Sequence, residues 1–153
     1  MGPSMPLGRG SAPLIRADDP CPCGSPKAYG ECCGREHHGA EPLTAERLMR
    51  SRYSAFATGD AEYLLLTWHS STRPATLRLD PAVEWLGLDV LGVFGGSAFE
   101  REGTVEFVAR YRVRRAEGQQ HERSRFRRED GRWRYLGEAP LGEPPHDGSG
   151  TSA

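Results

Sequence analysis

All four cysteines of the chain lie within thirteen residues, at a spacing suited to one metal ion. They form two pairs, Cys21-Pro-Cys23 and Cys32-Cys33, with eight residues between the pairs. A structural zinc site takes four thiolate or imidazole ligands in a closed tetrahedron. The pattern therefore predicts a small metal-binding knuckle held by Cys21, Cys23, Cys32 and Cys33. A closed site of this kind leaves no position for a substrate, so we expect no catalysis at the metal.

Several alternatives stay open for this site. Zinc is the expected ion because it suits thiolate-rich tetrahedral sites, but iron also accepts thiolates. His37 or His38, which follow the second pair, could replace one cysteine. Disulfides are the competing interpretation, and reducing conditions in the cytoplasm disfavour them. Metal binding would fold a segment that is too short to have a core of its own.

The composition indicates one ordinary domain with a small appendage. The chain has 153 residues and its longest apolar runs are only a few residues long, whereas a membrane helix needs roughly 20. Its first twenty residues contain no apolar segment typical of a signal peptide. We therefore expect a cytoplasmic protein that does not contact the membrane.

Arginines are concentrated near the end of the chain. Between Arg110 and Arg134, ten arginines against four acidic residues leave a local charge of +6, although the whole chain carries −1. Such a stretch could bind an anionic partner such as RNA. The competing interpretation is a solvated sheet face, because many of these arginines occupy alternate positions of predicted strands.

The apolar pattern changes period along the chain, and this change predicts the fold. Thr44 is a candidate N-cap, apolar residues then recur at helical spacing, and Gly59 is a stop signal. A second short helix is expected from about 60 to 68. From about 82 the period becomes two residues, with predicted turns at 117–119 and 130–131. Helices followed by about four antiparallel strands favour an α+β domain, with the helices covering one face of a curved sheet.

Four parts are predicted: a disordered leader at 1–17, the knuckle at 18–38, the α+β domain at 42–139 and a flexible tail at 140–153. Three aromatic residues could line the concave face of the sheet, although core packing explains them as well: Trp85, Tyr111 and Trp133. In such a pocket Glu122 is a candidate base, but no carboxylate pair or Ser/His/Asp set accompanies it. Arg50 or Arg52 could bind an anion together with Arg123 or Arg125.

Two blocks of the sequence resemble known families. The segment CPCGSPKAYGECC at 21–33 resembles the SEC-C motif, a metal-binding knuckle best known from the C-terminal tail of the bacterial preprotein translocase motor. The segment LMRSRYSAF at 48–56, with 63–64 and 67–69 behind it, resembles the YchJ-like family of small bacterial proteins. With 122–126, Trp133 and Tyr135 included, the resemblance covers about 20–138.

This resemblance implies both a fold and a role. The middle domain would have the nuclear-transport-factor-2-like (cystatin-like) fold, and all four cysteines would coordinate the metal. SEC-C knuckles are associated with recognition of chaperone or ribosome surfaces. We therefore expect a zinc-binding interaction module that docks on a protein or ribonucleoprotein partner. The alternative is a small-molecule-binding or enzymatic pocket in the α+β domain.

Overall fold

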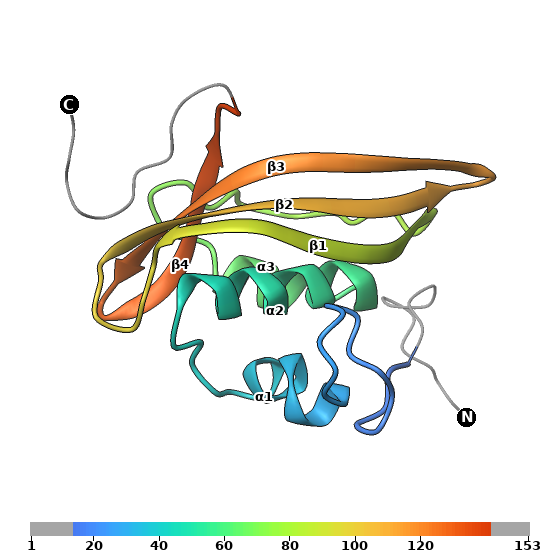
Figure 1. Ribbon diagram of the computed structural model, residues 1–153, viewed down its shortest axis with the longest axis horizontal. Helices are drawn as coiled ribbons and strands as arrows, with labels where there is room; N and C mark the ends of the chain where they lie inside the picture. Colours follow the sequence, from blue (N-terminus) through green and yellow to red (C-terminus); the bar gives the residue numbers. More distant parts are fainter. Residues whose placement is uncertain (1–13, 142–153) are drawn as a thin grey trace.

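The computed structural model describes residues 14–141, in which helices are followed by a four-stranded antiparallel sheet (Figure 1). The helical elements are a short 3-10 helix η2 (Tyr29–Glu31), α1 (Cys33–His37), α2 (Ala45–Thr58) and α3 (Ala61–Leu66). The strands are β1 (Val83–Gly95), β2 (Glu102–Val113), β3 (Ala116–Glu129) and β4 (Arg132–Ala139), in sheet order β1-β2-β3-β4. The predicted α+β class is confirmed. Most of the expected leader and tail falls on 1–13 and 142–153, outside the described residues.

The ends of helix α2 follow from local chemistry. The Thr44 hydroxyl accepts a hydrogen bond from the backbone N–H of Arg47 at 3.1 Å, which satisfies one free donor of the first turn. Gly59 ends the helix in the left-handed conformation, with φ of 76°. Asp60 then caps α3 by accepting from the N–H of Tyr63 at 3.0 Å. The caps at Thr44 and Gly59 are the ones that the sequence predicts.

One predicted turn is wrong. The hairpin between β2 and β3 turns at Arg114 and Arg115, three residues before the expected position at 117–119. Gly118 lies instead within β3, opposite Tyr111 of β2. A Cβ atom at Gly118 would come within 2.8 Å of the Tyr111 hydroxyl, so this glycine admits a neighbouring ring and makes no turn. The hairpin predicted at Asp130-Gly131 is present, and both residues have positive φ.

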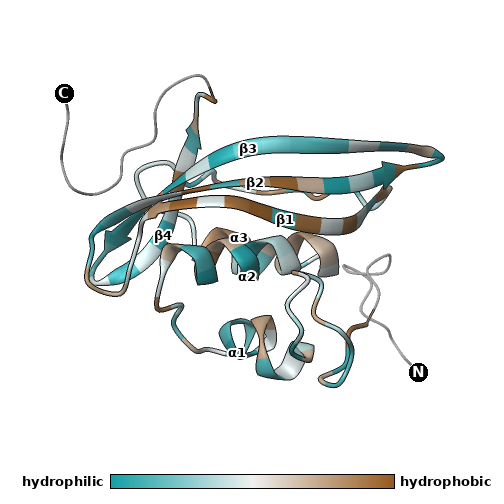
Figure 2. Ribbon diagram, in the orientation of Figure 1, coloured by the Kyte–Doolittle hydropathy of each residue, from teal (hydrophilic) through white to brown (hydrophobic). Residues whose placement is uncertain are grey.

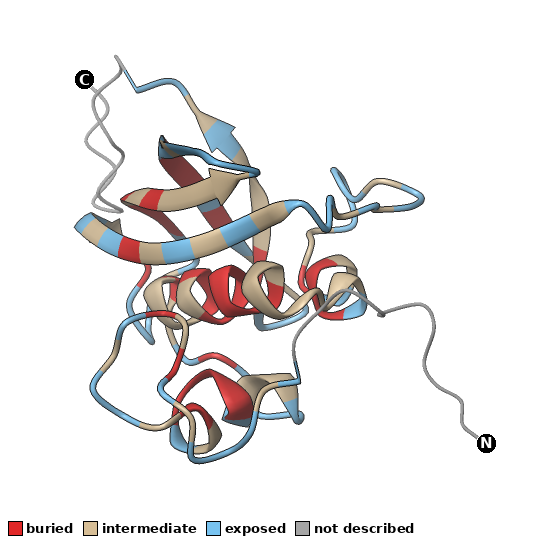
Figure 3. Cartoon of the chain, turned by 90° about the vertical axis from the view of Figure 1, so that its right-hand side faces the viewer, coloured by how far each residue is buried: buried red, intermediate tan, exposed pale blue. Residues whose placement is uncertain are grey.

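Helix α2 is the middle of three layers. It contacts β1, β2 and β4 of the sheet on one side and α1 of the knuckle on the other (Figures 1 and 3). Strand β1 is largely apolar along its length, whereas β3 is largely hydrophilic (Figure 2). One core cluster joins the four cysteines to residues of α2 and of the sheet, among them Leu48, Met49, Val105, Phe126 and Trp133. The knuckle is therefore part of the same core as the α+β domain.

Within residues 14–141, no helix is both long enough and apolar enough to span a membrane.

Candidate functional site

The structure brings the four predicted metal ligands together. Their Sγ atoms all lie within 4.8 Å of one another, and Cys23 Sγ is 3.7 Å from Cys32 Sγ. Four sulfurs bound about 2.3 Å from a central ion in a tetrahedron are about 3.8 Å apart, so the spacing fits such a site. All four side chains are buried and none forms a disulfide. Cys21 and Cys23 precede η2. Cys32 follows η2 directly, and Cys33 is the first residue of α1.

Arg47 of α2 supplies positive charge beside two of these sulfurs. Its Nη1 and Nη2 lie 3.6 Å from Cys32 Sγ and 3.7 Å from Cys33 Sγ. The same guanidinium donates two hydrogen bonds to Glu36 of α1, at 2.8 and 3.1 Å. Burial alone would lower the pKa of Arg47, but Glu36 and the nearby cysteines raise it above its ordinary value. Arg47 thus places a fixed positive charge and N–H donors beside two sulfurs, which complements the negative charge of a thiolate–metal site.

Other polar groups of α2 also contact the knuckle. Arg50 donates to the backbone oxygen of Cys23 at 3.0 Å and pairs with Glu46 at 3.0 Å. The buried Ser54 hydroxyl lies 3.7 Å from Cys21 Sγ. The second layer of the cysteine site is thus built by α2, and the site and the helix position each other.

The two histidines have other partners in the structure. His37 Nδ1 lies 2.7 Å from the Tyr29 hydroxyl, and His37 Nε2 lies 2.8 Å from the backbone oxygen of Ser51. His38 Nδ1 lies 2.7 Å from the backbone oxygen of Gly34. The geometry therefore favours four cysteines over a ligand set that includes a histidine. His37 connects the knuckle to α2 through hydrogen bonds instead.

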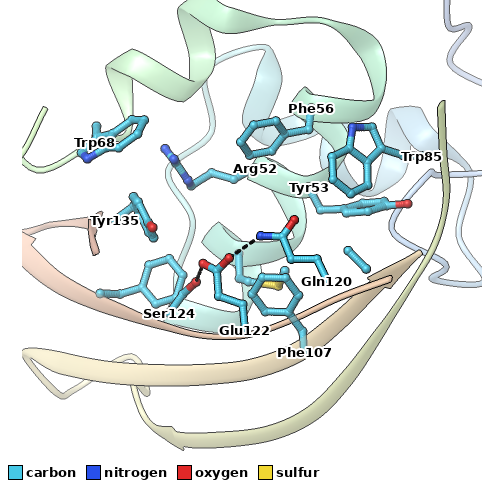
Figure 4. A pocket seen from close by; sticks show the side chains of 13 residues that line it. Arg52, Tyr53, Phe56, Trp68, Trp85, Phe107, Gln120, Glu122, Ser124 and Tyr135 are labelled. Atoms are coloured by element: carbon cyan, nitrogen blue, oxygen red, sulfur yellow. Dashed lines mark hydrogen bonds between the residues drawn. The ribbon is translucent and has the colours of Figure 1, made fainter. Parts of the chain in front are cut away.

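A second site lies between α2 and the concave face of the sheet (Figure 4). It is a cavity of about 280 Å³, just below the usual range for ligand pockets. Its lining combines aromatic side chains with a few polar ones: Met49, Arg52, Tyr53, Phe56, Trp68, Trp85, Phe107, Ala109, Gln120, Glu122, Ser124, Phe126 and Tyr135.

Arg52 is the cation of this pocket, and it is only 5% exposed. Its Nη1 donates to the backbone oxygen of Leu64 at 2.7 Å and to the Thr67 hydroxyl at 2.8 Å. Its Cζ atom lies 5.0 Å from the ring centre of Trp68 and 4.4 Å from that of Tyr135. Burial lowers the pKa of Arg52 to about 10, so the guanidinium stays charged at neutral pH. Arg52 is thus held rigidly, at the desolvation cost of a buried charge.

Glu122 of β3 is the anion of the pocket. Its Oε1 accepts from Gln120 Nε2 at 2.6 Å and its Oε2 accepts from the Ser124 hydroxyl at 2.8 Å. These three side chains share one face of β3, because alternate strand residues point the same way. Arg52 and Glu122 lie on opposite walls, one on the helix and one on the sheet, and no ion pair joins them (Figure 4). The pocket therefore presents two separate and opposite charges.

The sequence placed some of these residues correctly and missed others. Of the three predicted aromatic residues only Trp85 lines the pocket. Trp133 is fully buried in the core, and Tyr111 contacts Trp85 edge to face at 5.8 Å between ring centres. The suggested anion site of Arg50 or Arg52 with Arg123 or Arg125 is not assembled in the pocket. Arg123 and Arg125 lie on the side of β3 opposite to Glu122, and Arg123 pairs with Glu106 at 3.1 Å. Gln120 and Ser124 were missed, although their spacing about Glu122 could have indicated them.

The arginine-rich stretch is largely neutralised by its neighbours. Arg112 pairs with Glu84 at 3.1 Å and with Glu117 at 2.8 Å, and Arg127 pairs with Glu102 at 3.2 Å. Further pairs join Arg110 to Asp89 and Arg134 to Glu41. Most of these acids lie outside the 110–134 window in sequence but on adjacent strands. The arrangement favours the solvated-face interpretation over a binding surface for RNA.

Comparison with known proteins agrees with this architecture. The model of the YchJ middle NTF2-like domain matches residues 44–138, and the model of the SEC-C motif matches residues 19–35. The chain belongs to the YchJ-like family. Its relatives include UPF0225 proteins of Streptomyces coelicolor, 58% identical over 76% of this chain and 91% of the relative, and of Chromobacterium violaceum, 52% identical over 76% and 89%. The predicted family and motif are thereby confirmed.

Two solved structures have the same fold as this YchJ-like protein. A SEC-C motif protein of Rhodopseudomonas palustris superposes with a TM-score of 0.67 at 36% identity, over 79% of this chain and 98% of that one. A SEC-C motif protein of Psychrobacter arcticus superposes with a TM-score of 0.66 at 26% identity, over 88% and 92%. Both solved structures are of SEC-C motif proteins, and each likeness covers more than three quarters of this chain.

Proposed function

We propose that this protein binds a small molecule in the pocket between α2 and the sheet, and that a zinc ion on the four cysteines braces α2 for that purpose. The observation that carries the proposal is Arg52, a buried cation on the pocket wall that forms no ion pair with a carboxylate of residues 14–141. Natural proteins seldom retain a buried charge without a direct ion-pair partner unless it serves a function. Glu122 on the opposite wall gives the pocket a second polar end.

Zinc is the proposed ion because four buried thiols with donors behind them form a closed, sulfur-only site. Cys23 and Cys33 are fully buried, so a substrate has no access to the metal. The metal's role is then structural: it closes the knuckle, and the knuckle supports α2 through Arg47, Arg50 and His37. Elemental analysis of the native protein should give one zinc per chain; iron at the same ratio would replace zinc in this proposal.

The ligand-binding proposal can be tested by NMR, because the chain has only three tryptophans. Trp68 and Trp85 line the pocket, whereas Trp133 lies in the core and serves as an internal control. Fragments of diverse chemistry are added to the full zinc-loaded chain, and the indole N–H signals are followed. Binding in the pocket should move the signals of Trp68 and Trp85 and leave that of Trp133. If no fragment moves either pocket signal, the proposal fails.

Docking on a protein or ribonucleoprotein partner stays a prediction and is the second candidate. Its support is the outer side of the knuckle, where Lys27, Glu31 and Arg35 are exposed, and the nearby Leu43, which is 71% exposed. The paired arginines of the sheet weaken the ribonucleoprotein version. Salt-sensitive co-sedimentation of the zinc-loaded protein with ribosomes, lost in a Lys27→Glu/Arg35→Glu variant, would support docking; absence of co-sedimentation would remove that version.

A further inference from the structure

The open edge of Arg52 indicates what kind of molecule the pocket takes. Resting on the proposed ligand-binding function, we infer that the ligand is a small aromatic monocarboxylate with a hydroxyl or amino group at its far end. The carboxylate would bind Arg52, the ring would lie among the aromatic walls, and the far donor would reach Glu122.

The first step concerns the hydrogen bonds of the guanidinium. Only Nη1 of Arg52 is engaged, by Leu64 and Thr67. Among residues 14–141, neither Nε nor Nη2 has a hydrogen-bond partner. The N–H groups on Nε and Nη2 point in the same direction, along one edge of the planar group. Two parallel donors of this kind match the two oxygens of one carboxylate.

The second step concerns the charge of the ligand. Arg52 is the sole cationic side chain lining the described pocket, and Glu122 is its sole anionic one. A ligand with one negative charge pairs with Arg52 and leaves one excess negative charge beside Glu122, whereas a phosphate dianion would leave two in an apolar cavity. A ligand without an anionic group would give the Nε and Nη2 donors of Arg52 no charged acceptor. Of the two anions, a monocarboxylate is therefore favoured over a phosphate.

The third step concerns the body and the far end of the ligand. Aromatic rings form much of the wall, notably Tyr53, Phe56, Trp85 and Phe107, and flat apolar molecules pack well against such rings. Each Glu122 oxygen already accepts one hydrogen bond and has a second lone pair free. A hydroxyl or amino donor satisfies that lone pair. A cavity of about 280 Å³ limits the ligand to roughly the size of one substituted ring.

The test uses three probes that differ by one group each: 4-hydroxycinnamate, its amide and cinnamate. Affinities for the full zinc-loaded chain are measured by calorimetry, with the indole signals of Trp68 and Trp85 as the site report. The hydroxylated acid should bind at least about tenfold more tightly than its amide, because the amide loses a charge-assisted bidentate contact. Cinnamate should bind several-fold more weakly than the hydroxylated acid.

Two variants assign these preferences to their residues. Arg52→Lys keeps the positive charge but removes the two parallel donors on Nε and Nη2, so it should abolish the preference for the acid over the amide. Arg115→Lys, on the exposed hairpin between β2 and β3, is the matched control. Because Arg52 also donates to Leu64 and Thr67, the stability of this variant is measured alongside its binding. Glu122→Gln, which preserves shape, gives an independent test and should abolish the preference for the hydroxylated acid over cinnamate.

The outcomes separate this inference from the proposed function. Equal binding of acid and amide, with both pocket signals moving, would overturn the carboxylate class and leave ligand binding intact. The class is also overturned if none of the three probes binds while other fragments move the Trp68 and Trp85 signals. If no compound of any kind moves them, ligand binding fails together with its chemistry.

Discussion

Helix α2 places arginines on two sides, and their surroundings are opposite. Toward the knuckle, Arg47 and Arg50 each pair with a carboxylate and also donate to the cysteine segment. Toward the sheet, Arg52 is more deeply buried and pairs with no carboxylate of the described chain. Residues two positions apart on a helix point to different faces, so one helix serves both regions. Carboxylate pairing on the knuckle side indicates stability, and its absence among the described residues on the pocket side indicates binding.

Removing the metal should have the largest effect, and it should destabilise the knuckle and the pocket together. Metal binding contributes on the order of 10 kcal/mol to the folding of small thiolate knuckles, so chelation or Cys33→Ser should lower the free energy of unfolding by more than about 3 kcal/mol. Chemical unfolding of metal-free and metal-loaded protein measures this change. Lys27→Ala, an exposed change in the same loop, should be neutral. An unchanged unfolding curve after metal loss would contradict the bracing role.

Replacing Arg47 and Arg52 in turn tests the difference between the two sides of α2 most directly. Arg47→Met leaves Glu36 without its partner and removes two donors from the sulfurs, which should cost about 1–3 kcal/mol and weaken metal binding. Arg52→Met removes an uncompensated buried charge as well as two hydrogen bonds, so its net effect should lie within about 1 kcal/mol. Urea unfolding compares them. A larger loss of unfolding free energy for Arg52→Met than for Arg47→Met would show that Arg52 is structural.

A substitution at Tyr29 tests the contact between the knuckle and α2, with a smaller expected change in stability. Its hydroxyl bonds to His37, which in turn bonds to the backbone of Ser51 on α2. Tyr29→Phe should lower the free energy of unfolding by about 1 kcal/mol, as expected for one buried hydrogen bond. Tyr111→Phe is the control, because the Tyr111 hydroxyl has no hydrogen-bond partner among residues 14–141. An equal loss of unfolding free energy in both variants would contradict a specific contribution from the hydrogen bond between Tyr29 and His37.

The smallest effect should come from the outer side of the sheet. Hydrogen bonds from His121 and Arg123 lower the pKa of Glu106. The stabilisation is therefore present above the ordinary carboxyl pKa and is lost as the pH falls through the lowered value. Glu106→Gln should cost less than about 1 kcal/mol at neutral pH, and the difference from wild type should vanish in acid. Melting temperatures between neutral and acidic pH measure this; a difference that persists in acid would contradict it.

The sequence predicts the knuckle better than the pocket for a physical reason. The cysteine ligands lie within thirteen residues, so their spacing alone specifies a closed site, and the caps at Thr44 and Gly59 are equally local. The pocket instead needs Arg52 on α2 and Glu122 on β3, seventy positions apart, to face the same space. Which face of β3 meets α2 depends on strand register. The misplaced turn at Gly118 shows how easily that register is lost from sequence alone.

The layered arrangement of sheet, α2 and knuckle has a consequence for modularity. The SEC-C knuckle, although a separate motif in sequence, is part of the protein's own interior. A fragment that begins at α2 would expose the knuckle-facing side of that helix. A knuckle moved into another protein would lose the second layer of side chains that surrounds its sulfurs. Domain boundaries drawn from motif matches would therefore be poor guides for dissecting this protein. Its smallest foldable unit is expected to extend from the first cysteine to the last strand.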